Sequence, residues 1–523
     1  MTSQVGQNAS PVLDAVAGAG ETYGVAGLAR IRVIAFVVGA ASLGAEISAA
    51  RLLAPYFGAS TVIWANTIAT VLISLSVGYA LGGWLADRSP NVTGLCTVAL
   101  AAAALLALLP FVADPFLHLS VNALGSLSVG AFLGSLVAVL VLVAVPIILL
   151  GAAAPYANRL ALTDVANAGT VTGRLYAIST TGSLVGTFAS ALLLIPLVGA
   201  HRTFLVLSLA LALVAAPGLR ARRYLLVPVL VAGLIAVPPA AIGSGTAGGR
   251  VIYATETPYQ FARVIQFADG ERWLQLNEGV AIHSDYRPWS YLTGGYWDDF
   301  LALPLMSQRG APRRVAILGD AAGTTARAYG HYFPRTRVDA VELDGALSAI
   351  GRRFFDLHGP NLHLYTADAR PWLTASGARY DAIFLDAYRQ PYIPFYLLTR
   401  EFFETVREHL NPGGVLVVNV GHIPGSDALE KVVTATAHAV FPAVARDVVN
   451  ESNSLVLASM DALSARRMLA ESARLPPELR ALASAVATRL GPALHGGTVY
   501  TDDLAPVEWL TDLSVIQYAT RQR

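Results

Sequence analysis

Residues 315–344 read VAILGDAAGTTARAYGHYFPRTRVDAVELD and carry the clearest indication of the fold of this chain. An apolar segment runs into a turn that contains Gly319 and Gly323, a helix-forming segment follows, and a second apolar segment ends in Glu342. A strand, a glycine turn, a helix and a second strand that ends in an acid form a unit that binds adenosine groups. We therefore expect a nucleoside pocket at this turn.

Short apolar segments continue to alternate with helix-forming segments downstream. The expected strands are Arg314–Leu318, Arg337–Val341, Leu362–Tyr365, Ala382–Leu385 and Val415–Val420. This alternation predicts a doubly wound, Rossmann-like α/β domain with a parallel sheet over residues 291–523. Residues 251–290 instead alternate in polarity and are broken at Asp269-Gly270 and Glu278-Gly279, which predicts a small antiparallel β-sheet.

The residues before this part have the composition of a membrane protein. Over the whole chain 54% of residues are hydrophobic and 14% are charged, with a mean hydropathy of +0.54, whereas soluble domains have about 25% charged residues. A helix needs about 20 apolar residues to cross a bilayer. About seven spans result, namely Val33–Phe57, Val62–Ala86, Val92–Val112, Leu127–Leu150, Leu175–Val198, Thr203–Leu219 and Tyr224–Ile242.

These patterns divide the chain into five parts. Residues 1–29 are expected to be a disordered tail, 30–242 a multi-pass α-helical membrane domain, and 243–250, GSGTAGGR, a linker before the small sheet and the Rossmann-like domain. Arginines such as Arg88, Arg159 and Arg222 follow alternate spans, so the positive-inside rule places these loops in the cytoplasm. With seven spans this rule places the C-terminal domain outside the cell, and with six or eight spans it places the domain inside. We favour the cytoplasm, beside a cell membrane, because a nucleoside cofactor is made there.

Charge, cysteine content and residue spacing argue against a nucleic-acid partner, a disulfide and a metal site. The formal net charge is +1 and no clustered basic run is visible, which argues against nucleic acid. Cys96 is the one cysteine, so no disulfide can form within the chain. No His, Cys or Asp cluster has the spacing of metal ligands, and we predict no metal.

Three acids follow successive predicted strands, where a bound nucleoside would meet them. Glu342 can accept hydrogen bonds from both ribose hydroxyls, and Asp368, in TADAR, can accept one from the adenine amino group. Asp386, in FLDAY, lies where the reacting carbon would be placed. The alternative is that these acids only cap the helices that follow them.

The order of the motifs from about Glu256 to Val420 resembles the spermidine synthase (polyamine aminopropyltransferase) family, and the whole arrangement is similar to its bacterial membrane-fused members. The motifs are TPYQ at 257–260, GYWD at 295–298, LPL at 303–305, the glycine turn, VELD at 341–344, DAR at 368–370 and LDAY at 385–388. The resemblance implies the fold of S-adenosylmethionine-dependent methyltransferases. It also implies an enzyme that transfers an aminopropyl group from decarboxylated S-adenosylmethionine to a polyamine or another amine, releasing methylthioadenosine, with no permanently bound cofactor.

The resemblance assigns roles to particular residues. Asp386 would accept the proton of the amine, while Tyr296 and Asp298 orient that amine or close the pocket. The donor would be bound by Gln260, Gly319, Asp320, Gly323, Glu342 and Asp368, and the acceptor would meet Tyr259, Arg389 and Glu508. Aromatic packing is the alternative for Tyr259 and Tyr296, and a helix cap is the alternative for Glu508.

The chain departs from the family pattern at three places. The family turn GGGDG is GDAAG here, so Ala322 stands where the family has the acid that meets the amino group of the donor, and Asp320 is two residues earlier. The family YHE or YQE is Tyr296-Trp297-Asp298. The family DSSD or DSTD ends in Arg389 here, and like charges about 4 Å apart cost roughly 4 kcal/mol at an effective dielectric constant of about 20, which disfavours putrescine as the acceptor.

Two other functions fit the same sequence. A methyltransferase that uses intact S-adenosylmethionine would have the same pocket, and a membrane sensor or transporter would bind a nucleoside or polyamine without turnover. The expected partners are the lipid bilayer and a small amine. The oligomeric state is left open, with a homo-oligomer as one option.

Overall fold

The computed structural model describes residues 25–57, 61–124, 130–162, 165–237, 248–277, 281–307, 310–389, 392–511 and 514. Its contacts group the chain into two compact units. One unit is drawn from residues up to Ile242 and is helical, and the other contains Gly243–Arg523 and holds the sheets.

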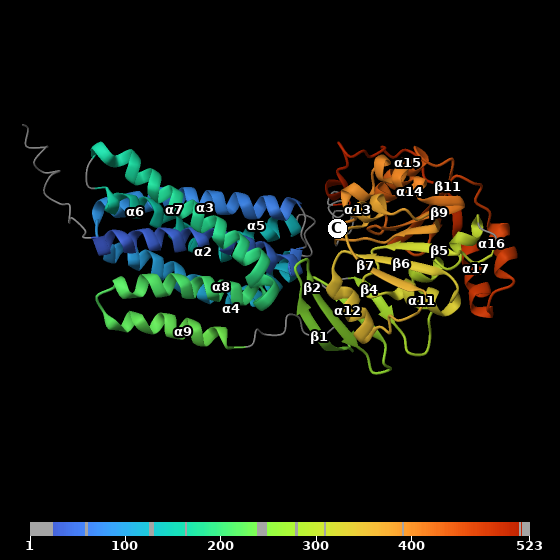
Figure 1. Ribbon diagram of the computed structural model, residues 1–523, viewed down its shortest axis with the longest axis horizontal. Coiled ribbons are helices and arrows are strands. Elements are labelled where there is room, and N and C mark those ends of the chain that lie inside the picture. The colour runs from blue at the N-terminus through green and yellow to red at the C-terminus, as the bar shows by residue number, and fades with distance from the viewer. Residues whose placement is uncertain are drawn as a thin grey trace, which may run out of the picture. The chain divides into compact units, whose positions relative to one another are not determined.

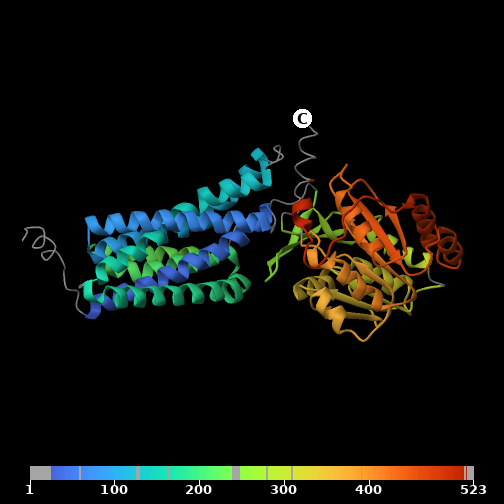
Figure 2. The same cartoon turned by 90° about the horizontal axis from the view of Figure 1, so that it is seen from above.

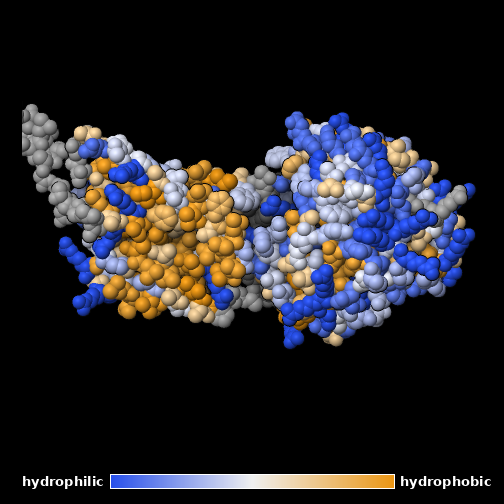
Figure 3. Space-filling model, in the orientation of Figure 1, coloured by the Kyte–Doolittle hydropathy of each residue, from blue (hydrophilic) through white to orange (hydrophobic). Residues whose placement is uncertain are grey.

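The first unit is a bundle of long apolar helices (Figures 1 and 2). Its helices are α2 (Val25–Phe57), α3 (Thr61–Arg88), α4 (Val92–Leu124), α5 (Gly130–Leu142), α6 (Ala144–Ala161), α7 (Ala168–Ala189), α8 (Ile195–Ala215) and α9 (Leu226–Ile235), with a π-helical turn, η2, at Ser190–Leu194. Apolar side chains cover the face of this unit seen in Figure 3. Such a surface fits a lipid environment better than water.

Within the described residues, five helical stretches are long and apolar enough to cross a membrane. They are Gly27–Leu53, Trp64–Arg88, Val92–Ala113, Ala144–Ala161 and Ala168–Gly218. The last contains two predicted spans, separated where Gly199 adopts φ 83° and breaks the helix. The predicted tail 1–29 overlaps α2, which starts at Val25, and its other residues lie outside the described part. Seven crossings stay a prediction.

Small residues let neighbouring helices of this unit approach closely. A Cβ atom on Gly78 would lie 2.4 Å from the carbonyl oxygen of Ile148, and one on Gly82 would lie 2.2 Å from that of Ala152, both in α6. Gly182 of α7 packs in the same way on Phe36 of α2. Helices in lipid associate through such close packing because burial of apolar surface no longer drives it.

The second unit begins with the small sheet. Strands β1 (Arg250–Glu256), β2 (Phe261–Gln266), β3 (Arg272–Leu276) and β4 (Ile282–Tyr286) pair antiparallel in this order. The predicted small antiparallel sheet is therefore confirmed. The predicted turn at Glu278-Gly279 and most of the linker 243–250 lie outside the described residues.

The large sheet has eight strands in the order β12-β10-β11-β9-β8-β5-β6-β7. They are β5 (Arg314–Leu318), β6 (Arg337–Glu342), β7 (Leu362–Thr366), β8 (Tyr380–Leu385), β9 (Leu410–Gly421), β10 (Ala443–Val448), β11 (Asn453–Ser459) and β12 (Leu490–Pro492). Strands β5 to β9 are parallel, as predicted, and form a doubly wound Rossmann-like sheet. The prediction of a wholly parallel sheet is wrong for β10, β11 and β12, which run antiparallel, because the short link from β10 to β11 permits only a hairpin.

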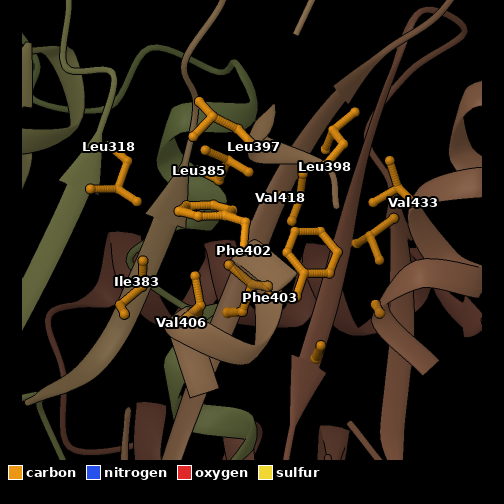
Figure 4. Close-up of a cluster of buried hydrophobic side chains, with 14 of the residues drawn as sticks. Leu318, Ile383, Leu385, Leu397, Leu398, Phe402, Phe403, Val406, Val418 and Val433 are labelled. Carbon is orange, nitrogen blue, oxygen red and sulfur yellow. The ribbon is translucent and has the colours of Figure 1, made fainter. Parts of the chain in front are cut away.

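Helices cover both faces of this sheet (Figure 1). They are α10 (Tyr296–Asp299), α11 (Thr324–Tyr332), α12 (Gly345–Phe354), α13 (Ala369–Ala375), α14 (Arg400–Glu408), α15 (Ala428–His438), α16 (Ala465–Ser472) and α17 (Pro477–Arg489). Every residue of β8 is buried, as expected for a strand covered on both faces. Figure 4 shows Phe402 and Phe403 of α14 packed over Ile383, Leu385 and Val418 of the central strands. This core fixes the ends of the strands, where the predicted acids lie.

Candidate active site at the carboxyl ends of the central strands

The candidate site lies where β5, β6 and β8 end. The chain passes from β5 to β6 on one side and later returns to β8 on the other side of β5, so the sheet has its switch point between β5 and β8. Loops that leave neighbouring strands in opposite directions open a crevice there, and doubly wound sheets bind ligands in it. Gly319, Glu342 and Asp386 stand at these three strand ends.

The glycine turn is packed directly against the end of β8. Gly319 has φ 92°, and a Cβ atom on it would lie 2.5 Å from the Cα atom of Ala387, so only glycine fits. Gly323 has φ 91° and packs on Leu357. The small sheet also holds the turn, since the amide of Ala322 donates to Ser284 Oγ at 2.9 Å.

Glu342 accepts a backbone hydrogen bond on each carboxylate oxygen. The amide of Ala321 donates to Oε2 and the amide of Asp344 donates to Oε1, both at 2.9 Å. Burial raises the pKa of Glu342 to about 7, although these two hydrogen bonds lower it. Each oxygen keeps a second lone pair, so the predicted acceptor of the two ribose hydroxyls is held in place and still able to accept.

The loop that carries the TPYQ motif is tied to the end of β6. Thr257 Oγ1 donates to Asp344 Oδ2 at 2.6 Å, and the side-chain nitrogen Nε2 of Gln260 lies 3.5 Å from the same oxygen. Asp344 caps α12 by accepting from the amide of Ala346. Gln260 is thus next to the predicted ribose site, while the side chain of Tyr259 is 49% exposed.

Asp386 receives hydrogen bonds from two other elements. Tyr296 Oη lies 3.1 Å from both carboxylate oxygens, and Asn419 Nδ2 donates to Oδ1 at 2.8 Å. Burial raises the pKa of Asp386 to about 7, although the hydrogen bonds from Asn419 and Tyr296 lower it. A carboxylate whose pKa is near the working pH is well matched to accepting and releasing a proton.

Asn419 and Tyr388 were not predicted from the sequence. Asn419 is buried near the end of β9, and its Oδ1 accepts from Asn453 Nδ2 at 3.0 Å, which orients the amide toward Asp386. Tyr388 Oη donates to the carbonyl oxygen of Asn419 at 2.9 Å and accepts from the amide of Gly421 at 2.6 Å. The available signal was a polar residue inside the apolar strand VLVVNV, since a buried polar group needs a partner.

Asp298 positions the loop before α10. It is 3% exposed, and its carboxylate accepts from the amides of Thr293 and Gly294 and from Thr293 Oγ1, at 2.7 to 3.1 Å. This loop leads directly into Tyr296 at the start of α10. The structure therefore brings Tyr296 to Asp386, and Asp298 holds the loop that precedes Tyr296. A direct role of Asp298 in catalysis stays a prediction.

After β7, where the sequence predicts contact with an adenine, Asp368 has a partner on each oxygen. The amide of Arg370 donates to Oδ1 at 3.0 Å, which caps α13, and Tyr396 Oη donates to Oδ2 at 2.7 Å. Arg389 is exposed, and its backbone pairs with Tyr392. Its positive charge counters the rise that burial and Asp368 cause in the pKa of Tyr396, so Arg389 acts on the surroundings of Asp368.

Asp502 and Glu508, the acids near the C-terminus, have contacts that differ from those of the acids at the strand ends. Asp502 forms a bidentate ion pair with Arg370, at 2.6 and 2.7 Å, and also accepts from Thr399 Oγ1. Glu508 lies partly buried in the helical turn 507–511. Its role in binding an amine stays a prediction.

Asp320, the second residue of the glycine turn, lies among these acids. It is 5% exposed, and neither of its carboxylate oxygens has a hydrogen-bond partner in the part of the chain that the structure describes. Burial, together with the charges of Glu342 and Asp386, raises the pKa of Asp320 well above its ordinary value. Among the described residues, no group of three His, Cys, Asp or Glu side chains is arranged to hold a metal ion.

Known proteins resemble the part of the chain that forms this crevice. The spermine/spermidine synthase domain family matches residues 295–450. A protein of Bifidobacterium longum (strain NCC 2705) named "Probable polyamine aminopropyl transferase" is 31% identical over 278 residues, which are 49% of this chain and 61% of that protein. The chain therefore spans about three fifths of the length of that relative.

Two further relatives carry different names. The polyamine aminopropyltransferase of Pyrobaculum calidifontis is 30% identical over 202 residues, which are 36% of this chain and 67% of that protein. Putrescine N-methyltransferase 2 of Nicotiana tabacum is 28% identical over 201 residues, covering 37% of this chain and 54% of that protein. The similarity thus extends to proteins named for two kinds of group transfer.

Proposed function

Because the C-terminal part of this chain belongs to the spermidine synthase (polyamine aminopropyltransferase) family, we propose that it transfers an aminopropyl group from decarboxylated S-adenosylmethionine to an amine. The observation that carries this proposal is the partly buried carboxylate of Asp386 at the switch point of the sheet, held by Tyr296 and Asn419. Its pKa of about 7 suits a group that must accept a proton near neutral pH.

The reaction needs a base because a primary alkylamine keeps its proton up to about pH 10, by analogy with lysine. Asp386 accepts that proton as the amine nitrogen attacks the carbon next to the sulfonium. The new carbon–nitrogen bond forms while the carbon–sulfur bond breaks, and its electron pair returns to sulfur. The products are the aminopropylated amine, neutral methylthioadenosine and protonated Asp386, so charge and protons balance.

The donor would lie along the ends of β5, β6 and β7. Glu342 accepts from the ribose hydroxyls, the turn from Gly319 to Gly323 leaves room for the nucleoside, and Gln260 borders the ribose. Asp368, held by Tyr396, meets the adenine. No permanently bound cofactor is part of this proposal.

The acceptor is proposed to be an amine other than a compact diamine such as putrescine. Arg389 stands three residues after Asp386, where the family carries a second acid, and its positive charge opposes a distal ammonium. Because Arg389 is exposed, water screens this repulsion, and the expected penalty is smaller than for a buried pair.

Methyl transfer is a second candidate, supported by the similarity to the putrescine N-methyltransferase of tobacco. It would use intact S-adenosylmethionine in the same crevice and release S-adenosylhomocysteine. Competition between the intact and the decarboxylated donor for binding separates the two reactions.

The helical unit is proposed to anchor this activity in the cell membrane, with the second unit in the cytoplasm. Basic residues gather at one end of the bundle, since Arg159 of α6 pairs with Asp87 of α3 at 3.1 Å, and Gly218 packs on Cys96 near Arg30. The positive-inside rule supports a cytoplasmic location for this end. We propose six crossings in place of seven, because α9 has 10 residues, about half of what a crossing needs. An even number of crossings leaves the second unit on the cytoplasmic side.

The test is an assay of the full-length protein in detergent with decarboxylated S-adenosylmethionine and a panel of mono-, di- and polyamines. We expect release of methylthioadenosine with at least one amine, and a loss of about a hundredfold or more in Asp386→Asn, the scale of general-base catalysis. Binding of the donor without product from any amine would overturn the enzymatic proposal in favour of a sensor or transporter.

A further inference from the structure

Helix α10 is attached to its surroundings at both of its ends. At its start, Tyr296 Oη lies 3.1 Å from both carboxylate oxygens of Asp386. At its last residue, Asp299 Oδ2 accepts from Arg489 Nη2 at 2.7 Å. The first contact belongs to the candidate site, whereas the second joins α10 to the end of α17 and has no task in the proposed reaction.

Arg489 is shared between two buried acids. Besides Asp299, it binds Asp447 of β10, since Nε donates to Oδ1 at 2.9 Å and Nη2 lies 3.1 Å from Oδ2. Asp299 and Asp447 are 2% and 0% exposed, so water does not replace either contact. One guanidinium therefore ties α10 to a strand near the edge of the large sheet.

The charge of Asp299 depends on Arg489. Burial and the charge of Asp447 raise the pKa of Asp299 to about 7, and Arg489 lowers it. The groups that face Asp299 are Asp447 from β10, Arg489 from α17 and Asp298 from α10 itself, whose charge also raises this pKa. Removing one partner of a buried ion pair leaves a charge that nothing compensates. Without Arg489, Asp299 must take up a proton or move toward water, and in both cases α10 loses its ion pair.

Helix α10 is too short to hold its own position. It has four residues, and isolated helices shorter than about 12 residues are marginal in water. Phe300, the next residue, stacks on Phe384 in the core, with ring centroids 4.7 Å apart. Burial of apolar surface is not directional, whereas charge-assisted hydrogen bonds fix orientation as well as distance. The ion pair of Asp299 with Arg489 therefore orients the helix that carries Tyr296.

On the basis of the proposed function, we propose that Arg489 is a positioning residue of the active site, which holds α10 through Asp299 and thereby keeps Tyr296 hydrogen-bonded to Asp386. The hydrogen bond from Tyr296 lowers the pKa of Asp386, so the loss of Arg489 should raise it. The other groups that face Asp386 are Trp297 of the same helix, Asn419 of β9, Tyr388 after β8, and the acids Glu342 and Asp320. Of these groups, only Trp297 would move with α10.

The chain offers a matched control for the loss of Arg489. Arg446 precedes Asp447 in β10, and its Nη1 donates to Glu430 Oε1 of α15 at 2.9 Å. Glu430 is 2% exposed, so Arg446 also neutralises a buried acid. Because successive side chains of a strand point to opposite faces, this ion pair lies on the other face of the sheet from α10. Arg489→Gln and Arg446→Gln therefore remove the same kind of contact, and only the first reaches α10.

The first measurement is hydrogen exchange of the full-length protein in detergent, read by mass spectrometry. The amides of Leu301 and Ala302 donate to the carbonyl oxygens of Asp298 and Asp299, so their exchange reports the opening of α10. In Arg489→Gln we expect this exchange to be about tenfold faster or more, as for the loss of a hydrogen bond to a charged group. In Arg446→Gln it should stay at the wild-type rate.

The second measurement is the pH dependence of kcat/KM, which a merely structural role would not move. Because the ionised form of Asp386 is the active base, the acidic limb follows its pKa. In Arg489→Gln the limb should move up by about half a unit to one unit, since Tyr296 is loosened and not removed. In a Tyr296→Phe background the same change should move the limb less than about half as far, because Arg489 acts through Tyr296.

Arg489→Lys keeps the inference testable if Arg489→Gln does not fold. Lysine retains the charge but lacks the planar fork that reaches Asp299 and Asp447 together. We therefore expect exchange of α10 and a limb position between those of the wild type and Arg489→Gln. Wild-type values for both in a folded Arg489→Lys, with Arg489→Gln unfolded, would mean that Arg489 only stabilises the fold and would overturn the inference.

Three other results would overturn the inference. They are an unmoved limb in Arg489→Gln, an equal shift of the limb in Arg446→Gln, and a full shift when Arg489→Gln is added to Tyr296→Phe. If the wild type forms no aminopropylated product with any amine, the proposed function fails and hydrogen exchange decides the inference alone. Faster exchange of α10 in Arg489→Gln but not in Arg446→Gln would then support it, and equal exchange in the two variants would refute it.

Discussion

Replacing Asn419 by alanine should move the pH dependence of the reaction to higher pH. The Nδ2 group of Asn419 donates to Asp386 Oδ1 at 2.8 Å in a buried position, and this hydrogen bond lowers the pKa of Asp386, which burial has raised to about 7. A hydrogen bond to a charged group contributes about 1.5 to 3 kcal/mol, and one pKa unit corresponds to about 1.4 kcal/mol. Its loss should therefore raise the pKa of Asp386 by about one to two units.

The consequence for the rate follows from which form of Asp386 is active. The base must be ionised, so kcat/KM rises with pH and levels off above the pKa of Asp386 in the free protein. In Asn419→Ala the acidic limb should move from about pH 7 to between about pH 8 and 9. At pH 7 the rate should fall about 5- to 50-fold, and most of it should return at pH 9.5.

The assay is the release of methylthioadenosine between pH 5.5 and 9.5, at low donor concentration, for the wild type and Asn419→Ala. Asn453→Ala is the matched control, because it removes only the group that orients Asn419 and should shift the limb by a smaller amount. An equal loss at every pH, with an unmoved limb, would refute the assignment of Asp386 as the base. An acidic limb that moves to lower pH would contradict the expectation that the hydrogen bond from Asn419 lowers the pKa of Asp386.

Three further predictions concern the turn, the acceptor and the membrane. In Gly319→Ala the new Cβ atom would lie 2.5 Å from a backbone atom, at a residue with φ 92°. Chemical denaturation should show a free energy of unfolding lower by about 2 to 4 kcal/mol. In the control Gly377→Ala, where nothing lies within 4 Å of the new Cβ atom, it should change by less than about 0.5 kcal/mol. Arg389→Asp should lower the KM for putrescine about tenfold, while the exposed control Arg480→Asp should not, and an unchanged KM would mean that Arg389 does not face the acceptor. Protease added outside sealed cells should leave the second unit intact, and its digestion there would refute a cytoplasmic location.

The parallel strands could be predicted because each is a short apolar run bounded by polar turns. The expected strand Arg314–Leu318 coincides with β5, and the expected Arg337–Val341 differs from β6 by one residue. Of the antiparallel strands, β10 was missed because its residues, AVARDV, are mostly only partly buried and their pattern resembles a loop. The apolar helices were predicted from length and hydropathy, and the break at Gly199 falls in the gap between the expected spans Leu175–Val198 and Thr203–Leu219.

The candidate site could be predicted where a residue follows a strand in the chain, as Glu342 and Asp386 do. The contacts that tune these acids come from elements distant in sequence, so the sequence did not reveal them. Asn419 reaches Asp386 from β9, and Tyr396 reaches Asp368 across 28 positions. The absence of a partner for Asp320 among the described residues is likewise a property of the packed turn.

The most direct test of aminopropyl transfer is a single turnover with a donor labelled at two places. Decarboxylated S-adenosylmethionine carries one isotope in its aminopropyl chain and another in its S-methyl group, and the full-length protein is in excess over it. Mass spectrometry should find the aminopropyl label in the amine and the methyl label in methylthioadenosine, with neither transfer in Asp386→Asn. The methyl label in the amine, or both labels still in the donor after it has bound, would contradict the assignment.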